Sequence, residues 1–402
     1  MARFLFAVPP LTGHVNPTVS VGGVLAERGH EVAWVGHPTK VGPLLPEGAH
    51  LIPLDDRLPP GMLAERRAKA DSVRGLAAFK FLFEEFLVPL ARAMEPQVSR
   101  AITDYRPDLV IVDHQVFGGA FAARKAQLPW ASFVTTSASV TNALHELPKV
   151  QQWMHEQLAA LEQESGLQPM PNPERSPYLV TVFSTGALVG DVRDFEPHYA
   201  FVGPSIVQRP PVPFPWQELD PNKSKVLVSL GTVNVSRGKR FFGAVCEALA
   251  DSDLQVILVA GQDAVPDPPA NVIRRNYVPQ LDLLPHMDVV ISHGGHNTVC
   301  ESLANGLPLL VTPIKDDQPV VARQVVEAGA GLRLRFRRAG AKEIRACIDR
   351  LLNEPHFGEA AKHIGDSFRA AGGAERASTQ LEELAKTRQA YDRNADNWGA
   401  PT

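Results

Sequence analysis

The 402-residue sequence has few cysteines and no surplus of basic residues. Its three cysteines, Cys246, Cys300 and Cys347, lie far apart and form no C-x-x-C or Cys/His metal-ligand spacing. Because disulfide frameworks and zinc sites need such spacing, we expect reduced thiols and a cytoplasmic location. The net charge of −4 provides no basic surplus for binding nucleic acid or an anionic membrane surface by charge alone.

Long apolar runs are also missing. The first apolar run, residues 4–8, has the length of a strand and stops at Pro9-Pro10, so it does not resemble a signal peptide. No run approaches the ~20 apolar residues that a membrane-spanning helix requires. With 44% hydrophobic residues and a length beyond that at which single cores usually divide, the chain is expected to be a soluble enzyme of more than one domain.

Strand and helix patterns alternate through the first half of the chain. The expected strands are short, nearly unbroken apolar runs, as is typical of parallel strands covered on both faces. They are residues 3–8, 31–35, 51–54, 109–112 and 130–134. A loop over residues 9–16 and a helix over 17–28 follow the first of them. This alternation predicts an α/β domain with a doubly wound sheet.

The composition changes between residues 204 and 224, where repeated prolines leave little room for a helix or a central strand. A second alternating set follows this segment. Its expected strands are residues 225–230, 254–259, 272–276, 289–292 and 309–312. We therefore expect two Rossmann-like domains, residues 1–203 and 225–390, joined by a proline-rich linker over 204–224 and followed by a polar tail over 391–402.

The most informative segment is residues 289–313, VVISHGGHNTVCESLANGLPLLVTP. Its pattern predicts a strand, a glycine-rich turn, a helix and a second strand. The turn places four candidate ligands at the start of the helix: His293, Gly295, Asn297 and Thr298. A helix N-terminus suits an anionic group such as phosphate, and Glu301, one turn further on, suits the hydroxyls of a ribose. The segment predicts a site for a nucleotide diphosphate.

Three other expected strand ends in the same domain carry polar groups. Ligands of open parallel sheets bind beyond the carboxyl ends of the strands, so these groups are expected near the same crevice. They are Ser229 and Thr232 in Ser-Leu-Gly-Thr, Tyr277, Val278 and Gln280 in Tyr-Val-Pro-Gln, and Asp317 with Gln318. An aromatic face beside an amide is suited to stacking on and hydrogen-bonding a nucleobase.

The order of these motifs resembles the UDP-glycosyltransferases of the GT-B fold. The motifs are Ser-Leu-Gly-Thr, Val-Pro-Gln, His-Gly-Gly-x-Asn-Thr-x-x-Glu and Pro-x-x-x-Asp-Gln. The chain looks most similar to bacterial macrolide and other natural-product glycosyltransferases. The resemblance covers essentially the whole chain, including TGHVNP at residues 12–17 and GGA at 372–374. It implies two doubly wound domains facing each other across a cleft, the first binding the acceptor and the second the nucleotide-sugar donor.

The resemblance also implies roles for the donor-domain residues. Tyr277 would stack on the base, beside the Val278 backbone and Gln280; many family members have tryptophan at this position. The diphosphate would be held by His293, Gly295, Asn297 and Thr298, flanked by Ser229 and Thr232. Glu301 would bind the ribose, and Asp317 and Gln318 would bind hydroxyls of the donor sugar. Two structural alternatives remain at this point: Glu301 as a solvated helix residue, and Asp317 as a helix N-cap.

His14 is the candidate catalytic base. It follows the first expected strand, and a histidine with a pKa near neutrality suits removal of a proton from an acceptor hydroxyl. A carboxylate that fixes the tautomer of the imidazole makes such a base more effective. Asp113 ends the fourth expected strand, and the resemblance pairs it with His14. Asp108 starts that strand and is expected at the opposite edge of the sheet. The structural alternative is that His14 merely caps a helix and Asp113 merely turns the chain.

The predicted function is transfer of glucose from UDP-glucose to a hydroxyl of a hydrophobic natural product, with inversion at the anomeric carbon. The resemblance implies no cofactor beyond the nucleotide sugar and no bound metal, and no D-x-D cluster is positioned to hold one. Alternatives are a dTDP-deoxysugar donor, a sugar-nucleotide epimerase and a non-catalytic partner of another transferase.

The phenylalanine-rich stretch over residues 79–86 is expected in the core, with some members lining an acceptor pocket. Candidates for the pocket wall are Phe117, Trp130, Thr136, Ser137 and Trp153. The sequence leaves open whether the protein is a monomer or a homodimer.

Overall fold

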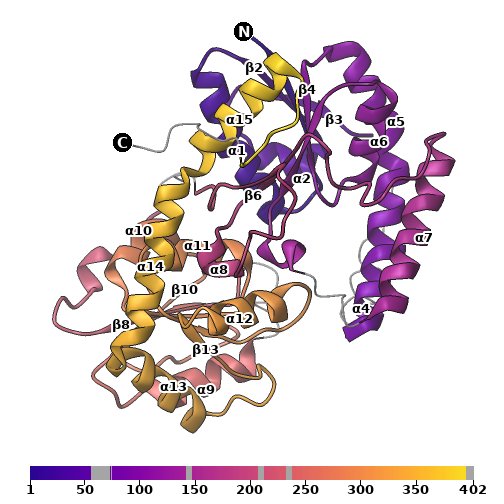
Figure 1. Ribbon diagram of the computed structural model, residues 1–402. Helices are drawn as coiled ribbons and strands as arrows, with labels where there is room; N and C mark the ends of the chain where they lie inside the picture. The colour runs from indigo at the N-terminus through magenta and orange to yellow at the C-terminus, as the bar shows by residue number, and fades with distance from the viewer. Residues whose placement is uncertain (56–72, 74, 142–146, 207–211, 232–237, 395–402) are drawn as a thin grey trace. The chain divides into compact units, whose positions relative to one another are not determined.

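The computed structural model describes residues 1–55, 73, 75–141, 147–206, 212–231 and 238–394 (Figure 1). The chain forms two compact units. Unit 1 contains Met1–Phe183, Val192–Val207 and Gly372–Thr402, and unit 2 contains Ser184–Asp191 and Gln208–Ala371. Among the described residues, no helix is both long and apolar enough to cross a membrane.

Unit 1 contains a seven-stranded parallel sheet in the order β3-β2-β1-β4-β5-β6-β7. The strands are β1 (Arg3–Ala7), β2 (Glu31–Gly36), β3 (His50–Pro53), β4 (Leu109–Asp113), β5 (Trp130–Val134), β6 (Leu179–Val182) and β7 (Tyr199–Phe201). The strand order reverses between β1 and β4, which are hydrogen-bonded neighbours with Ala7 opposite Val112. In open α/β sheets, ligands bind at the carboxyl ends of the strands at such a reversal.

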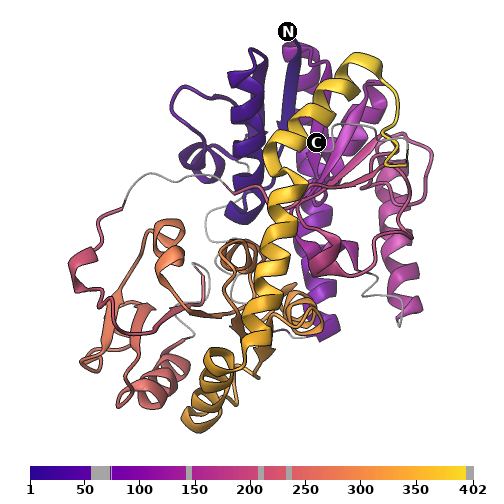
Figure 2. The same cartoon turned by 60° about the vertical axis from the view of Figure 1, so that its left-hand side comes forward.

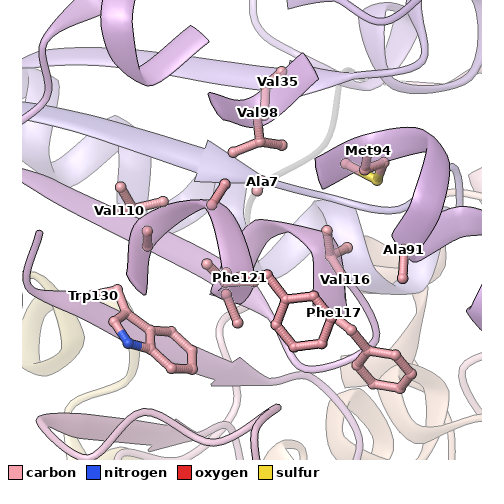
Figure 3. Close-up of a cluster of buried hydrophobic side chains, with 14 of the residues drawn as sticks. Ala7, Val35, Ala91, Met94, Val98, Val110, Val116, Phe117, Phe121 and Trp130 are labelled. Atoms are coloured by element: carbon pink, nitrogen blue, oxygen red, sulfur yellow. The ribbon is translucent and has the colours of Figure 1, made fainter. Parts of the chain in front are cut away.

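Alternate side chains of β1 point to two separate cores. Leu5 and Ala7 pack on one face with α5 (Val88–Tyr105) and α6 (Phe117–Lys125), as the buried side chains around Phe121 illustrate (Figure 3). Phe4 and Phe6 pack on the other face with α1 (Thr12–Glu27) and α15 (Gly373–Thr387). The other α-helices are α2 (Pro38–Val41), α4 (Gly75–Leu82) and α7 (Pro148–Glu164), and η2 (Phe83–Leu87) is a π-helix. Because both faces are covered, the strands are apolar throughout.

Unit 2 contains a six-stranded parallel sheet in the order β10-β9-β8-β11-β12-β13. The strands are β8 (Lys225–Ser229), β9 (Gln255–Val259), β10 (Val272–Arg275), β11 (Val289–Ser292), β12 (Leu309–Val311) and β13 (Gly331–Arg333). The helices are α8 (Gly186–Val189), α9 (Lys239–Leu249), α10 (Gln280–Leu283), α11 (His296–Ala304), α12 (Gln318–Glu327), α13 (Ala341–Asn353) and α14 (Pro355–Ala371). The strand order reverses between β8 and β11. The predicted pair of doubly wound α/β sheets is confirmed.

Two expectations about the chain's course are corrected. First, α1 begins at Thr12, not near residue 17, so Pro17 lies inside the helix and His14 in its first turn. Pro17 is the sixth residue of α1, beyond the first turn whose N–H groups lack internal partners, so it removes one backbone hydrogen bond from the second turn. Second, the C-terminal helix α15 belongs to unit 1, where it lies alongside α1 (Figure 2).

The packing of α15 in unit 1 has a physical reason. Its apolar face, with Leu381 fully buried, joins the core around β1, and its polar face forms ion pairs with residues that follow α1. Arg28 Nη1 lies 2.6 Å from Glu382 Oε2, and His30 Nε2 lies 2.8 Å from Glu382 Oε1. The sequence-based boundaries, which placed residues 225–390 in one domain, were therefore wrong for this helix.

Candidate active site

In unit 1, His14 and Asp113 meet at the reversal of strand order. Asp113 is the last residue of β4, and His14 lies in the first turn of the helix that follows β1. The Nδ1 atom of His14 is 2.9 Å from Oδ2 of Asp113, although the two residues are 99 positions apart in sequence. Asp108, before the start of β4, accepts a hydrogen bond of 2.8 Å from the Arg3 backbone N–H, at the opposite end of the strand.

Asp113 is held as a buried carboxylate. Its exposed fraction is 1%, and Oδ1 accepts a hydrogen bond of 2.9 Å from the Gln115 backbone N–H. Burial alone would raise the pKa of Asp113, but the nearby His14 and His114 rings and these hydrogen bonds outweigh it and hold the pKa below its ordinary value. An ionised carboxylate cannot donate a hydrogen bond, so Nδ1 of His14 carries the proton and Nε2 carries the lone pair that acts as a base.

The hydroxyl of Thr135 completes this cluster. It follows β5, with Oγ1 2.8 Å from Nδ1 of His14 and 3.0 Å from Oδ2 of Asp113. This residue was not predicted from the sequence. Its position directly after a central strand that neighbours β4 is the signal that could have pointed to it.

His114, which was also missed from the sequence, stacks on His14. The two ring centroids are 5.4 Å apart and the planes differ by 24°. Nδ1 of His114 donates to the Phe133 carbonyl at 3.2 Å, and Nε2 accepts from the Ser139 hydroxyl at 3.0 Å. Burial lowers the pKa of His114 to about 3, despite the opposing effect of Asp113. A neutral ring beside His14 adds no positive charge that would oppose protonation of the base.

His14, Asp113 and His114 also form the group of potential metal ligands found among the described residues, with ligand atoms within 4.8 Å of one another. A resident metal does not fit their hydrogen bonds. Both nitrogens of His114 are engaged, one with a carbonyl and one with a hydroxyl. Nδ1 of His14 faces the carboxylate as its hydrogen-bond donor. A metal ion would have to displace these hydrogen bonds. The same hydrogen bonds orient the His14 ring, which suits the cluster to proton transfer.

In unit 2, the glycine-rich turn and α11 form the candidate donor site. The turn follows β11, whose neighbour β8 ends with Ser229 opposite Ser292. Gly295 is the N-cap of α11 and supplies no side-chain cap, and the first turn, which includes His296, Asn297 and Thr298, contains no acidic residue. The N-terminus of such a helix presents backbone N–H groups and the positive end of its dipole, which favours an anion.

His293 lies directly beside this helix start. A Cβ atom at Gly231 would lie 2.7 Å from its Cε1 atom, so the ring packs against that glycine. Its Nδ1 atom is buried and has no hydrogen-bond partner among the residues that the structure describes. Burial lowers the pKa of His293 to about 4, partly opposed by the charge of Asp317 and by the Ser229 backbone, so the ring is neutral near neutral pH. A buried ring nitrogen without a partner is uncommon, because it costs free energy until a ligand satisfies it.

Glu301, in the second turn of α11, is hydrogen-bonded to Gln280. Glu301 is only 4% exposed, so the interpretation of a solvated helix residue was wrong. The Nε2 atom of Gln280, at the start of α10, donates to Oε2 of Glu301 at 2.5 Å. Tyr277, three residues before Gln280, is 52% exposed, whereas Val278 is buried. An exposed aromatic ring is suited to stacking on a base, and a fixed amide–carboxylate pair to hydrogen-bonding a ribose.

The residues at the start of α12 have distinct surroundings. Asp317 is the N-cap residue of α12, as the structural alternative expected, but its side chain makes no capping hydrogen bond. Oε1 of Gln318 accepts hydrogen bonds from the backbone N–H groups of Ile314 at 2.9 Å and Lys315 at 3.1 Å. These bonds fix the Gln318 side chain and leave its NH₂ group to donate to a ligand.

In the loop after β8, Oγ of Ser229 accepts a hydrogen bond of 3.4 Å from the Gly231 backbone N–H, and Thr232 lies outside the described residues.

Of the candidates for the acceptor-pocket wall, some lie in the core and others at its margin. Trp130 is 1% exposed and belongs to the core, so its assignment to the wall was wrong. The ring of Phe83, in the π-helix η2, contacts Phe117 with centroids 5.8 Å apart and Trp153 with centroids 5.3 Å apart. π-Helical turns are frequent at functional sites. The partly buried Trp153 and Phe79 at the margin of this cluster remain candidates for an apolar wall.

Known proteins are similar to this chain in sequence and in fold. Residues 244–384 match the family described as Erythromycin biosynthesis protein CIII-like, C-terminal domain. The "Uncharacterized UDP-glucosyltransferase YojK" of Bacillus subtilis is 29% identical, over 96% of this chain and 98% of that protein. The 4'-demethylrebeccamycin synthase of Lentzea aerocolonigenes is 28% identical, over 92% and 96% respectively. The crystal structure of CalG4, the calicheamicin glycosyltransferase, matches with a TM-score of 0.81 and 24% identity over 96% of this chain and 99% of that chain.

These similarities extend over nearly the whole chain and include both doubly wound sheets. The fold is GT-B. In sequence, the chain is similar to proteins that are named as glycosyltransferases.

Proposed function

We propose that this enzyme transfers glucose from UDP-glucose to a hydroxyl of a hydrophobic small-molecule natural product, with His14 as the general base and Asp113 supporting it. The observation that carries the proposal is the hydrogen bond of 2.9 Å between Nδ1 of His14 and the buried carboxylate of Asp113. It leaves the Nε2 lone pair of His14 as the basic atom. This is the same division of roles as between histidine and aspartate in hydrolase triads.

The reaction is a single displacement. Nε2 of His14 takes the proton of the acceptor hydroxyl while that oxygen bonds to the anomeric carbon of the sugar. The bond between the anomeric carbon and the phosphate oxygen breaks, and the nucleotide diphosphate leaves with the electron pair. Attack in line with the leaving group inverts the configuration, so an α-linked donor gives a β-glycoside. The Asp113 carboxylate stabilises the imidazolium that forms.

The arrangement in unit 2 supports a nucleotide diphosphate as the leaving group. The start of α11 favours its negative charge, and the buried Nδ1 of His293 lacks, among the described residues, the partner that a phosphate oxygen would supply. Glu301, held by Gln280, would accept hydrogen bonds from the ribose, and Tyr277 would stack on the base. Asp317 and the NH₂ group of Gln318 would bind sugar hydroxyls. The name of the Bacillus subtilis relative also supports a UDP-glucose donor.

A dTDP-deoxysugar donor is the second candidate, because the same diphosphate site would accept it. Two side chains for sugar hydroxyls, Asp317 and Gln318, favour glucose, since a deoxysugar offers fewer hydroxyls. The experiment is mass spectrometry of products from a panel of UDP- and dTDP-sugars with a diverse acceptor library. A hexosyl product from UDP-glucose is expected. Epimerised nucleotide sugar without any glycoside would reject the proposal.

Two variants separate the two parts of the proposal. His14→Ala is expected to lower kcat severely and leave UDP affinity nearly unchanged, because His14 touches the acceptor proton and not the nucleotide. His293→Ala is expected to weaken UDP binding, measured by calorimetry. His363→Ala, on the exposed surface of α14, is the matched control. Wild-type turnover in His14→Ala would remove this residue from the mechanism, and unchanged affinity in His293→Ala would reject the donor site.

A further inference from the structure

We infer that Thr135 is a positioning residue for the catalytic base: its hydroxyl fixes the tautomer and orientation of His14 by bridging His14 and Asp113. The inference rests on the proposed function of His14. The three side chains form a closed triangle, with distances of 2.9 Å between His14 and Asp113, 2.8 Å between His14 and Thr135, and 3.0 Å between Thr135 and Asp113.

The donors and acceptors of this triangle allow one assignment. The Asp113 carboxylate only accepts, so the Thr135 O–H donates to its Oδ2. The lone pairs of the Thr135 oxygen then face Nδ1 of His14, whose N–H is shared between that oxygen and the carboxylate. Both acceptors favour the tautomer with the proton on Nδ1. They also both stabilise the imidazolium, whose positive charge strengthens each hydrogen bond.

The surroundings make the hydroxyl of Thr135 rigid. The side chain is 3% exposed, and it follows β5, whose Phe133 lies opposite Asp113 in the sheet. The hydroxyl of the next residue, Thr136, makes a different kind of contact. Its Oγ1 accepts the Ala138 backbone N–H at 3.4 Å and caps the short helix η3 (Ser137–Val140). The two adjacent threonines therefore differ in role, and Thr135 is the one that bridges the base and its carboxylate.

Without the hydroxyl, the imidazole loses one of its two acceptors at Nδ1. A ring held there by the carboxylate alone can tilt about that bond, which turns the Nε2 lone pair away from the acceptor oxygen. Catalysis depends steeply on such geometry, whereas binding of the nucleotide in unit 2 does not involve these atoms. The expected defect is therefore in kcat, with the KM for the nucleotide sugar nearly unchanged.

The test compares Thr135→Val, which keeps the shape and removes the hydroxyl, with Thr135→Ser, which keeps the hydroxyl. Loss of a hydrogen bond to a charged group predicts that Thr135→Val lowers kcat roughly 10- to 100-fold. Thr135→Ser should recover most of this loss. The matched control is Thr181→Val on β6, which removes a buried hydroxyl that has no hydrogen-bond partner in the described part of the chain. Its kcat should equal that of the wild type, even though it disturbs the same sheet.

A second measurement does not require turnover. The ¹⁵N spectrum of histidine-labelled protein, with the His14 signals assigned from a His14→Gln variant, reports the tautomer directly. The wild type should show a protonated Nδ1 and Thr135→Val a mixture of tautomers or faster exchange of that proton. Wild-type spectra for Thr135→Val would overturn the inference, as would wild-type kcat where His14→Ala is inactive. Full turnover in His14→Ala would instead reject His14 as the base. In that case the spectra alone would decide whether Thr135 fixes the tautomer of His14.

Discussion

The imidazole of His293 occupies the space that a side chain at Gly295 would need. A Cβ atom at position 295 would lie 2.6 Å from Nε2 of His293, and one at Gly231 would meet the same ring at 2.7 Å. The sequence predicted Gly295 as part of the diphosphate site and included Gly231 only in the Ser-Leu-Gly-Thr motif. The structure gives both glycines a shared reason, because they make room for the ring of His293. Such close approach is a general use of glycine in ligand-binding loops.

Gly295→Ala should therefore weaken nucleotide binding without unfolding the protein. The backbone at Gly295 has φ −63°, which alanine adopts readily, so the added methyl group acts only through its contact with His293. We expect UDP affinity to fall by roughly tenfold or more, because the displaced ring can no longer donate to the diphosphate. The measurement is calorimetry with UDP.

Gly243→Ala is the matched control, since nothing lies within 4 Å of a Cβ atom at this position in α9. Alanine in a helix should stabilise the protein by about 0.5–1 kcal/mol and leave UDP binding unchanged. Equal affinities for Gly295→Ala and Gly243→Ala would show that the position of His293 does not matter for the nucleotide.

Asp113→Asn should lower kcat by roughly 100-fold or more, with little change in UDP affinity. Asparagine keeps the size of the side chain but removes the charge that stabilises the imidazolium of His14. Its amide can also present an N–H to Nδ1, which favours the wrong tautomer. Steady-state kinetics with saturating acceptor measures the effect. The control is Asp108→Asn, at the opposite end of β4, and an equal loss in both variants would indicate damage to the sheet instead.

The sequence was sufficient to predict two doubly wound sheets, because buried parallel strands are read from apolar runs and their order along the chain. It was also sufficient for the strand ends that carry His14 and Asp113, since residues at the carboxyl ends of neighbouring strands meet. Strands β6, β7 and β13 were missed. They have only three or four residues each, and β7 and β13 are edge strands, with β7 paired to β6 and β13 to β12.

Other features depend on contacts that no local pattern records. The return of α15 to unit 1 depends on which core buries its apolar face, and an amphipathic pattern does not specify its partner. The bridging hydroxyl of Thr135 and the stacked ring of His114 lie 121 and 100 residues from His14. Both residues directly follow expected strands, but their contact with His14 depends on side-chain geometry that the sequence does not show.

Glu301→Gln should reduce UDP affinity by roughly tenfold, because a neutral amide accepts weaker hydrogen bonds from ribose hydroxyls than a carboxylate. The bond of 2.5 Å from Gln280 fixes one carboxylate oxygen, so Glu301 would present its other oxygen to the ribose. The loss should be smaller for 2'-deoxy-UDP, which has one hydroxyl fewer. Calorimetry with both nucleotides measures the difference. Glu327→Gln, exposed on α12, is the control, and an equal loss for both nucleotides would argue against contact with the 2'-hydroxyl.

Acid should destabilise the protein through His114. Burial lowers the pKa of this residue from 6.5 to about 3, so the folded protein leaves it neutral where the unfolded chain binds a proton. Between those two values the unfolded state binds more protons, and the free energy of unfolding therefore falls as the pH falls through 6.5. Asp113 does not contribute in the upper part of this window, since its pKa lies below 3.8.

The variant that tests this is His114→Gln, whose amide can donate to the Phe133 carbonyl and accept from Ser139 but does not titrate. Below the ordinary histidine pKa, the free energy of unfolding of the wild type should fall by about 1.4 kcal/mol for each pH unit because of His114. When the pH is lowered from about 7.5 to about 5, the wild type should therefore lose about 2 kcal/mol more than the variant. Urea unfolding at the two pH values measures both losses. The exposed His363→Gln should behave as the wild type does. If the free energy of unfolding falls equally with pH in the wild type and in His114→Gln, then His114 is protonated in the folded protein. The conclusion that a neutral ring lies beside His14 would then be wrong.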